Sequence, residues 1–124
     1  MQGYRELKVY QKSYQAARAV YRMTERFPEE EKYGMKSQMR RAAMSIALNI
    51  SEGYAKRESQ QEFKRFLMMA IGSANEMEVL IEFAKDFGYI DKEMYRKAKE
   101  EYEAIGRMLN GMISEVSKNI EKER

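Results

Sequence analysis

The sequence lacks the side chains on which most enzymes and metal sites depend. Its 124 residues include no cysteine, no histidine and no tryptophan, and only one proline. Without cysteine there are no disulfides and no thiolate nucleophiles, and without cysteine and histidine the usual ligands of zinc are missing. The absence of histidine also excludes the Glu-x-x-His motif of di-iron bundles, and neither glycine-rich phosphate-binding motif occurs. We therefore expect no catalytic residue, no metal and no cofactor, and a protein that is not an enzyme.

Long apolar runs are absent as well. No segment approaches the roughly 18 consecutive apolar residues of a membrane span, and the start, MQGYRELKVY, carries charges where a signal peptide is apolar. We expect a cytoplasmic protein with no membrane partner. Hydrophobic residues make up 44% of the chain and charged residues 35%. This balance favours a single folded, helix-rich domain over residues 1–124.

Four segments have apolar residues at helical intervals of three and four. They predict helices over about residues 6–26, 34–55, 60–87 and 92–118. The Phe27-Pro28 pair ends the first helix, Gly53 is a candidate C-cap of the second, and Ser59 and Asp91 are candidate N-caps of the third and fourth. Short links between such helices predict an all-α fold, an antiparallel up-down-up-down four-helix bundle. The faces expected to turn inward are Leu7, Tyr10, Tyr14, Ala17 and Tyr21 in the first helix, Met35, Met39, Ala42, Ile46 and Ile50 in the second, Phe63, Leu67, Ala70, Ala74, Met77, Ile81 and Ala84 in the third, and Tyr95, Ala98, Tyr102, Ile105, Leu109, Met112 and Val116 in the fourth.

The two middle helices also carry apolar residues on the faces opposite these stripes. Ala47 and Ala55 in the second helix and Gly72 and Phe87 in the third add to these faces. Exposed apolar patches usually mark interaction surfaces, and the simplest partner of a small helical domain is a second copy of itself. We therefore expect a homo-oligomer; the alternative is that the bundle buries more of these helices than an idealised helical wheel suggests. The candidate interface residues are Met44, Leu48, Met68, Met69, Val79 and Phe83.

Positive charge is concentrated in the first half of the chain. Residues 1–57 contain twelve Lys and Arg against six Asp and Glu, whereas residues 58–124 contain eleven against fourteen. Such asymmetry points toward an anionic partner, most commonly nucleic acid. The alternative is a solvated face with local ion pairs such as Arg22 with Glu25 and Arg65 with Glu62. The candidate nucleic-acid contacts are Arg18, Arg22, Arg26, Lys36, Arg40, Arg41, Lys56, Arg57, Lys64 and Arg65.

A polar edge follows the second helix. Ser45, Asn49 and Glu52 are spaced i, i+4 and i+7, so they lie along one side of it. They form either a polar site that reaches across the bundle or, as we favour, a structural hydrogen-bond network with Ser73. No base-reading motif and no clear aromatic stacking platform is visible in the sequence, which favours recognition of nucleic acid by charge and shape.

The run RRAAMSIALNISEGYAKRES, residues 40–59, and its flanking sequences resemble a known family. The similarity covers about residues 4–116, and its most specific pieces are FPEEEKYGM, QMRRAAMSI, NISEG and AIGSANE. They resemble the bacterial four-helix-bundle proteins encoded in intervening sequences of large-subunit ribosomal RNA genes. The accessory variability proteins of diversity-generating retroelements share that fold. The residues matched are Arg40, Arg41, Ser45, Asn49, Glu52, Gly53, Gly72, Ser73 and Glu76.

The resemblance implies a function without catalysis. It implies a barrel-like homopentamer with a basic surface that binds nucleic acid, and structured RNA is the ligand we favour. The alternative is the retroelement role, in which the pentamer also binds a reverse transcriptase and template RNA as a scaffold for mutagenic copying. An orphan bundle with no nucleic-acid role is a third reading of the same residues.

Overall fold

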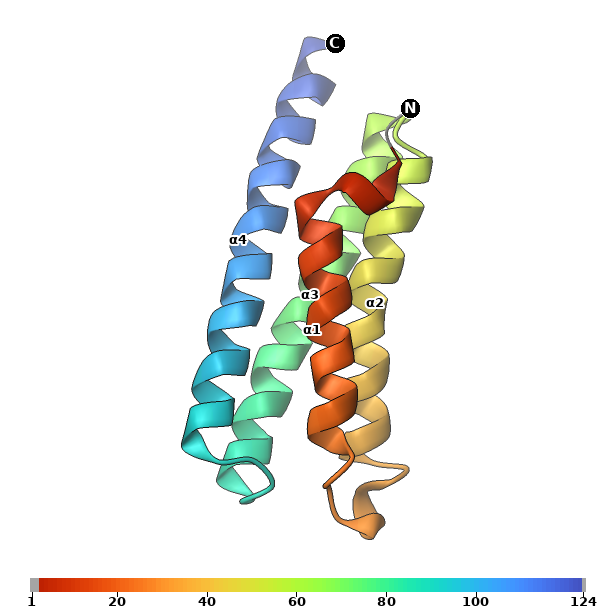
Figure 1. Cartoon of the computed structure of the whole chain (residues 1–124). Helices are drawn as coiled ribbons and strands as arrows, with labels where there is room; N and C mark the ends of the chain where they lie inside the picture. The colour runs from red at the N-terminus through yellow and green to blue at the C-terminus, as the bar shows by residue number, and fades with distance from the viewer. Residues whose placement is uncertain (1–2, 124) are drawn as a thin grey trace.

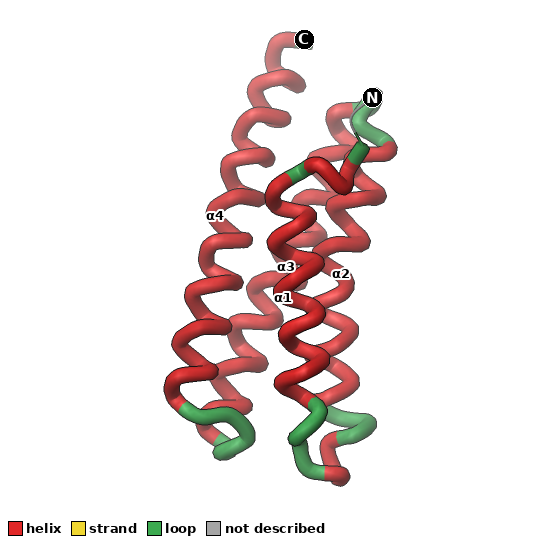
Figure 2. Tube along the Cα trace, viewed as in Figure 1, coloured by secondary structure: helices red, strands yellow, loops and turns green. Residues whose placement is uncertain are grey.

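Four α-helices make up most of the chain. The computed structural model describes residues 3–123 and contains no strand within them (Figure 2). The all-α prediction is therefore confirmed. Figure 1 shows the helices side by side, with the α1–α2 and α3–α4 connections at one end of the bundle and the α2–α3 connection at the other. The elements are the 3₁₀-helix η1 (Tyr4–Glu6), α1 (Lys8–Thr24), the 3₁₀-helix η2 (Glu29–Glu31), α2 (Met35–Ala55), α3 (Gln60–Asp86) and α4 (Lys92–Lys122).

Side-chain caps fix where α3 and α4 begin. The Ser59 hydroxyl accepts a hydrogen bond from the Glu62 N–H at 3.2 Å, and the Asp91 carboxylate accepts one from the Met94 N–H at 2.8 Å. Each bond satisfies a backbone donor that has no partner inside the helix. Gly88 follows α3 with φ +79°, a left-handed conformation that glycine adopts most readily, and it turns the chain toward α4.

Helices α1 and α4 differ in length from the sequence prediction. Residues Tyr4–Glu6 form a 3₁₀-turn, so α1 begins at Lys8; it ends at Thr24 and not at residue 26, and α4 continues to Lys122, past the expected end at residue 118. Gly53 lies inside α2 and is not its C-cap, because the helix continues to Ala55. Its role is contact with α3: a Cβ at this position would lie 2.8 Å from the Cβ of Phe66. The glycine therefore lets α2 and α3 approach closely.

The hydrophobic core lies between α2, α3 and α4, with α1 packed on one side. The predicted inward stripe of α3 is buried along its whole length, and the centres of the stripes on α2 and α4 are fully buried. Burial of these side chains supplies the main driving force for folding. The largest fully buried apolar side chains are Met39, Ile46, Ile50, Leu67, Met77, Ile81, Tyr102, Ile105 and Leu109.

The inward face predicted for α1 is only partly right: Ala17 is buried and Leu7 and Tyr10 pack against the core, but two of the predicted residues are exposed. Tyr14 and Tyr21 are 48% and 38% exposed, whereas Val9, Ser13 and Val20 are buried. The buried stripe of α1 consists of small or β-branched residues, which let the helix lie close to its neighbours. The tyrosines lie instead at the edge of the bundle, where their rings are partly covered and partly exposed. Among residues 3–123, no helix has the length and apolar character needed to cross a membrane.

Candidate nucleic-acid interface

Arg40 is one of ten candidate cations, and α1 holds it in place. Its Nε donates to the Thr24 hydroxyl oxygen at 2.9 Å, and its Nη2 donates to the Tyr21 carbonyl and to a Glu25 carboxylate oxygen, each at 3.2 Å. The guanidinium also lies 4.2 Å from the centroid of the Tyr21 ring. Thr24 is fully buried. Arg40 therefore joins α1 to α2 and is not available as a free contact for phosphate.

Three further cations have partners near the α2–α3 connection. Arg65 makes two hydrogen bonds to the Glu62 carboxylate, at 3.0 and 3.1 Å, and this contact holds the pKa of Glu62 below its usual range. Lys56 pairs with Glu52 at 3.4 Å, and Arg57 donates to the Tyr54 carbonyl at 2.7 Å. All three cations are exposed, so their pairing is weak and reversible in water.

The other six candidates make no side-chain hydrogen bond or salt bridge with any residue between 3 and 123. Arg18 and Arg22 on the exposed side of α1, together with Arg26 in the turn that follows the helix, form a row that we call the basic crest. Arg41 is exposed on the outer side of α2, and Lys36 is half-buried near the start of that helix. Lys64 lies away from these residues and lines a hollow between α3 and α4. The structure therefore does not bring all ten cations together.

A groove runs between α1 and α2 on one side of the basic crest. It encloses about 500 Å³, and we call it the tyrosine groove. Its aromatic side chains form a row: the rings of Tyr10 and Tyr14 are stacked with centroids 6.0 Å apart, and Tyr4 meets Tyr10 edge-on at 4.9 Å. Burial raises the pKa of Tyr10 above its usual value. The residues that line the groove are Tyr4, Tyr10, Tyr14, Ala17, Arg18, Tyr21, Arg22, Met44, Ala47, Leu48 and Ser51.

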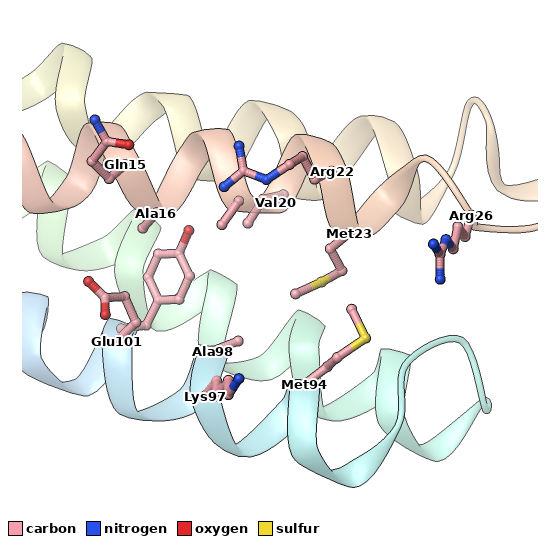
Figure 3. Close-up of a pocket in the computed structure, with 12 residues that line it drawn as sticks. Gln15, Ala16, Val20, Arg22, Met23, Arg26, Met94, Lys97, Ala98 and Glu101 are labelled. Carbon is pink, nitrogen blue, oxygen red and sulfur yellow. The ribbon is translucent and has the colours of Figure 1, made fainter.

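A second groove, of about 600 Å³, separates α1 from α4 on the other side of the crest. Figure 3 shows Met23 of α1 and Met94 of α4 pointing toward each other across it, with Arg22 on the α1 side, Lys97 on the α4 side and Arg26 beyond the end of α1. Glu101 also lines this groove and pairs with Lys12 at 3.1 Å. The α1–α4 groove is therefore lined by both basic and acidic side chains, whereas the residues that line the tyrosine groove include basic but no acidic side chains.

Three of the four residues predicted for the polar network are hydrogen-bonded to one another through Ser45. Ser73 donates to the Ser45 hydroxyl oxygen at 2.9 Å, and the Asn49 amide donates to the Ser45 hydroxyl oxygen and carbonyl at 3.0 and 2.9 Å. Glu52 is not part of this network, because it is exposed and pairs with Lys56. The Ser73–Ser45 hydrogen bond links α3 to α2, and the Asn49–Ser45 hydrogen bonds lie within α2. These contacts are typical of a structural hydrogen-bond network. Among residues 3–123 no cluster of acidic side chains could hold a metal ion.

The candidate interface residues are all exposed, but they fall on two surfaces. Met44 and Leu48 line the tyrosine groove. The other four lie with Phe87 on the outer side of α3, and we call these five residues the apolar α3 face. Ala47, which the sequence placed on an outer face, is buried against α1. The exposed fractions on the apolar α3 face are 56% for Met68, 45% for Met69, 52% for Val79, 48% for Phe83 and 55% for Phe87.

The tyrosine groove is the feature that the sequence did not predict. Tyr10, Tyr14 and Tyr21 were assigned to the core, so no aromatic platform was expected. A signal was present in the same segment: Val9, Ser13, Ala16 and Val20 form a second stripe at helical spacing. Had that stripe been placed inward, the tyrosines would have faced the α1–α2 edge.

Comparison with known proteins agrees with this fold. The chain is similar to a protein of unknown function from the S23 ribosomal protein family of Bacteroides thetaiotaomicron VPI-5482, whose crystal structure was determined at 1.70 Å resolution. The identity is 27% and the TM-score 0.77, over 86% of this chain and 95% of the other. No curated protein sequence matches the chain. The family model of the 23S rRNA-intervening sequence protein matches residues 5–111, and the chain belongs to that family.

Proposed function

We propose that this chain is a non-enzymatic, cytoplasmic protein that binds structured RNA through the basic side of α1 and α2. In this proposal the helices form an up-down-up-down bundle, and the bundle assembles into a homopentamer through the apolar α3 face. Each copy then contributes one basic surface, so a modest patch on each chain becomes a multivalent one. The family name, which refers to ribosomal RNA, supports RNA as the ligand.

The observation that carries the proposal is the charge of α1. The helix contains four basic residues and no acidic residue, and its basic crest is exposed. Arg41 on the adjacent helix adds a further cation without a side-chain partner among residues 3–123. Contacts of this kind with phosphates supply affinity that depends on charge and falls as salt rises.

Substitution of Arg18, Arg22 and Arg41 together by Glu tests the proposal. We expect weaker binding of a labelled RNA hairpin and a flatter dependence of affinity on salt between about 50 and 200 mM, by about 0.7 to 0.9 in the logarithmic slope for each lost phosphate contact. Fluorescence anisotropy at several salt concentrations measures both quantities.

A second triple variant on α4 controls for net charge. Lys92, Lys99 and Arg107 are exposed and make no salt bridge within residues 3–123, so their change to Glu alters the net charge equally. We expect this variant to retain most of the affinity. Equal weakening by both variants would contradict the assignment to α1 and α2, and a wild-type protein that binds no RNA would refute the function.

A further inference from the structure

The tyrosine groove combines aromatic and cationic side chains without a balancing negative charge. Four of the nine tyrosines of the chain line it, together with Arg18 and Arg22, and none of its lining residues is a carboxylate. The α1–α4 groove, by contrast, includes Glu101. An anionic ligand with flat, apolar parts therefore matches the tyrosine groove better than it matches the α1–α4 groove.

The tyrosines of α1 follow one another along the helix, so they offer several ring faces to a ligand. Tyr10 and Tyr14 are stacked, and the 1.5 Å rise per helical residue places Tyr21 about 16 Å along the axis from Tyr10. Tyr14 is 48% exposed and Tyr21 38% exposed, so both rings have surface available to a ligand. The guanidinium of Arg40 holds the Tyr21 ring, and the Tyr21 hydroxyl donates to the Met44 sulfur at 3.8 Å. The row is therefore fixed before any ligand arrives.

Arg18 and Arg22 lie on the same side of α1 as the exposed rings. Both line the groove, both are exposed, and neither has a hydrogen-bond or salt-bridge partner among residues 3–123. Their spacing of four residues separates them by about one helical turn, with Arg18 between the levels of Tyr14 and Tyr21 and Arg22 one residue beyond Tyr21. Cations and ring faces thus alternate along the groove, the arrangement by which proteins bind single-stranded nucleic acid.

We infer that the tyrosine groove binds an unpaired, single-stranded stretch of RNA, whose bases stack on Tyr14 and Tyr21 and whose phosphates contact Arg18 and Arg22. This inference rests on the proposed RNA-binding function and names the part of the RNA that the groove takes. The bases must be unpaired because those of a duplex are stacked inside it and cannot reach a protein ring. The loops and ends of a structured RNA supply such segments.

Substitution of Tyr14 by Leu, alone and with Tyr21→Leu, tests the stacking contact, because leucine keeps apolar volume but has no ring face. We expect Tyr14→Leu to weaken binding of a short unstructured RNA oligonucleotide about fivefold or more, the range reported for loss of one stacked base. Tyr14→Phe keeps the ring and should bind like the wild type. The salt dependence of affinity should not change in either variant, because the phosphate contacts stay.

A matched control and a second ligand complete the experiment. Tyr33 is 88% exposed in the α1–α2 connection, outside the groove, and Tyr33→Leu should leave affinity unchanged. A blunt RNA duplex of the same length should bind more weakly than the single strand, and Tyr14→Leu should not alter its affinity. Anisotropy titrations give the affinities, and light scattering gives the molar mass of every variant.

The possible results separate the inference from the proposed function. If the wild type binds RNA but Tyr14→Leu does so equally well, the inference is wrong and the function stands. If Tyr14→Phe loses as much affinity as Tyr14→Leu, stacking is not the contact and the inference is again wrong. A change of molar mass in Tyr14→Leu would mean that a second copy covers the groove, which also overturns the inference. A wild-type protein that binds no RNA refutes the proposed function itself.

Discussion

Arg40 and Arg41 are adjacent in the sequence but have different surroundings. The side chain of Arg40 is 20% exposed and reaches across to α1, where it satisfies the hydroxyl of the buried Thr24. Arg41 is exposed and makes no such contact among residues 3–123. One helical step of about 100° accounts for the difference. The first side chain therefore contributes to the fold, and the second is available to a ligand.

Replacement of each arginine by Ala should separate these roles. We expect Arg40→Ala to lower the free energy of unfolding by about 1 to 3 kcal/mol, the usual effect of losing hydrogen bonds to a charged group, and Arg41→Ala to lower it by less than about 0.5 kcal/mol. Urea unfolding followed by circular dichroism measures both values. Arg40→Lys should recover little of the loss, since an ammonium cannot reproduce the three hydrogen bonds of the guanidinium. Equal stability of the two alanine variants would contradict this division.

The sequence predicted one side-chain contact of the candidate site correctly and missed another. Arg65 and Glu62 are three residues apart on one helix, so their pairing follows from helical spacing alone. The contact of Arg40 with Thr24 spans sixteen residues and two helices, and it depends on the angle at which α1 crosses α2. The spacing of residues within one helix carries no information about that crossing angle. Arg22, expected to pair with Glu25, has no salt bridge among the described residues.

At the scale of the helix, the inward faces of α2, α3 and α4 were predicted correctly. The stripes of α2, α3 and α4 are rich in Met, Ile and Leu and lie inward as expected. In α1 two stripes compete, one of tyrosines and one of small residues such as Ala16 and Ser13. Periodicity gives both stripes similar weight, because it does not record that a phenol hydroxyl prefers water or that small side chains allow closer packing.

The contact between α2 and α3 depends on a missing side chain at Gly53. Alanine normally stabilises the interior of a helix by up to about 1 kcal/mol relative to glycine. At Gly53 the added Cβ would lie 2.8 Å from the Phe66 Cβ, close to the backbone of α3, so the helices must move apart. We expect Gly53→Ala to be destabilising by about 1 to 3 kcal/mol, as for other overpacked sites. Chemical unfolding measures the change.

Gly72 on α3 provides the control for this prediction. It is exposed, and a Cβ there would meet no atom within 4 Å. Gly72→Ala should therefore be stabilising by up to about 1 kcal/mol, through helix propensity alone. If both substitutions stabilise the protein, the close approach of α2 and α3 at Gly53 does not constrain the fold.

The start of α2 is tied to the α3–α4 connection by the Glu31 carboxylate. One oxygen accepts the Met35 N–H at 3.0 Å and the other accepts the Tyr89 hydroxyl at 2.8 Å. The Met35 backbone hydrogen bond, followed by the Tyr89 one, lowers the pKa of Glu31. A carboxyl whose pKa is lowered by folding stabilises the folded state above its unfolded pKa, about 4.3. It loses that contribution as pH falls through the lower, folded pKa.

Substitution of Glu31 by Gln should therefore act on stability in a pH-dependent way. We expect Glu31→Gln to lower the urea midpoint at pH 7, where the carboxylate is charged. The difference from the wild type should shrink as pH falls from about 4.3 through the lower pKa of the folded state, below which the Glu31 carboxyl is neutral. Unfolding curves at pH 7, 5 and 3 provide the measurement, and Glu30→Gln, on the exposed neighbour, is the matched control. A difference that does not change with pH would show that the charge of Glu31 is not involved.

At the scale of the whole molecule, the basic crest and the apolar α3 face belong to different parts of the bundle. The basic crest lies on α1 and the turn after it, and the apolar α3 face gathers five large side chains that are each about half exposed, including the rings of Phe83 and Phe87 with centroids 5.6 Å apart. Apolar patches of this kind are costly in water and are usually covered by a partner. A ring of copies joined through α3 would leave α1 of each copy open to RNA. The arrangement therefore suits an oligomer that presents repeated basic surfaces.

The molar mass in solution tests this arrangement. We expect light scattering of the wild-type protein to give about five times the chain mass of 14.7 kDa. The double variant Val79→Glu with Phe83→Glu should give the monomer, because it places two charges in the apolar contact. Tyr33→Glu adds a charge at an exposed aromatic residue outside the apolar α3 face and should leave the mass unchanged. If the wild type is a monomer, a different protein is the expected partner of this face. An oligomer that survives the double variant would place the interface elsewhere, with the tyrosine groove as the next surface to test.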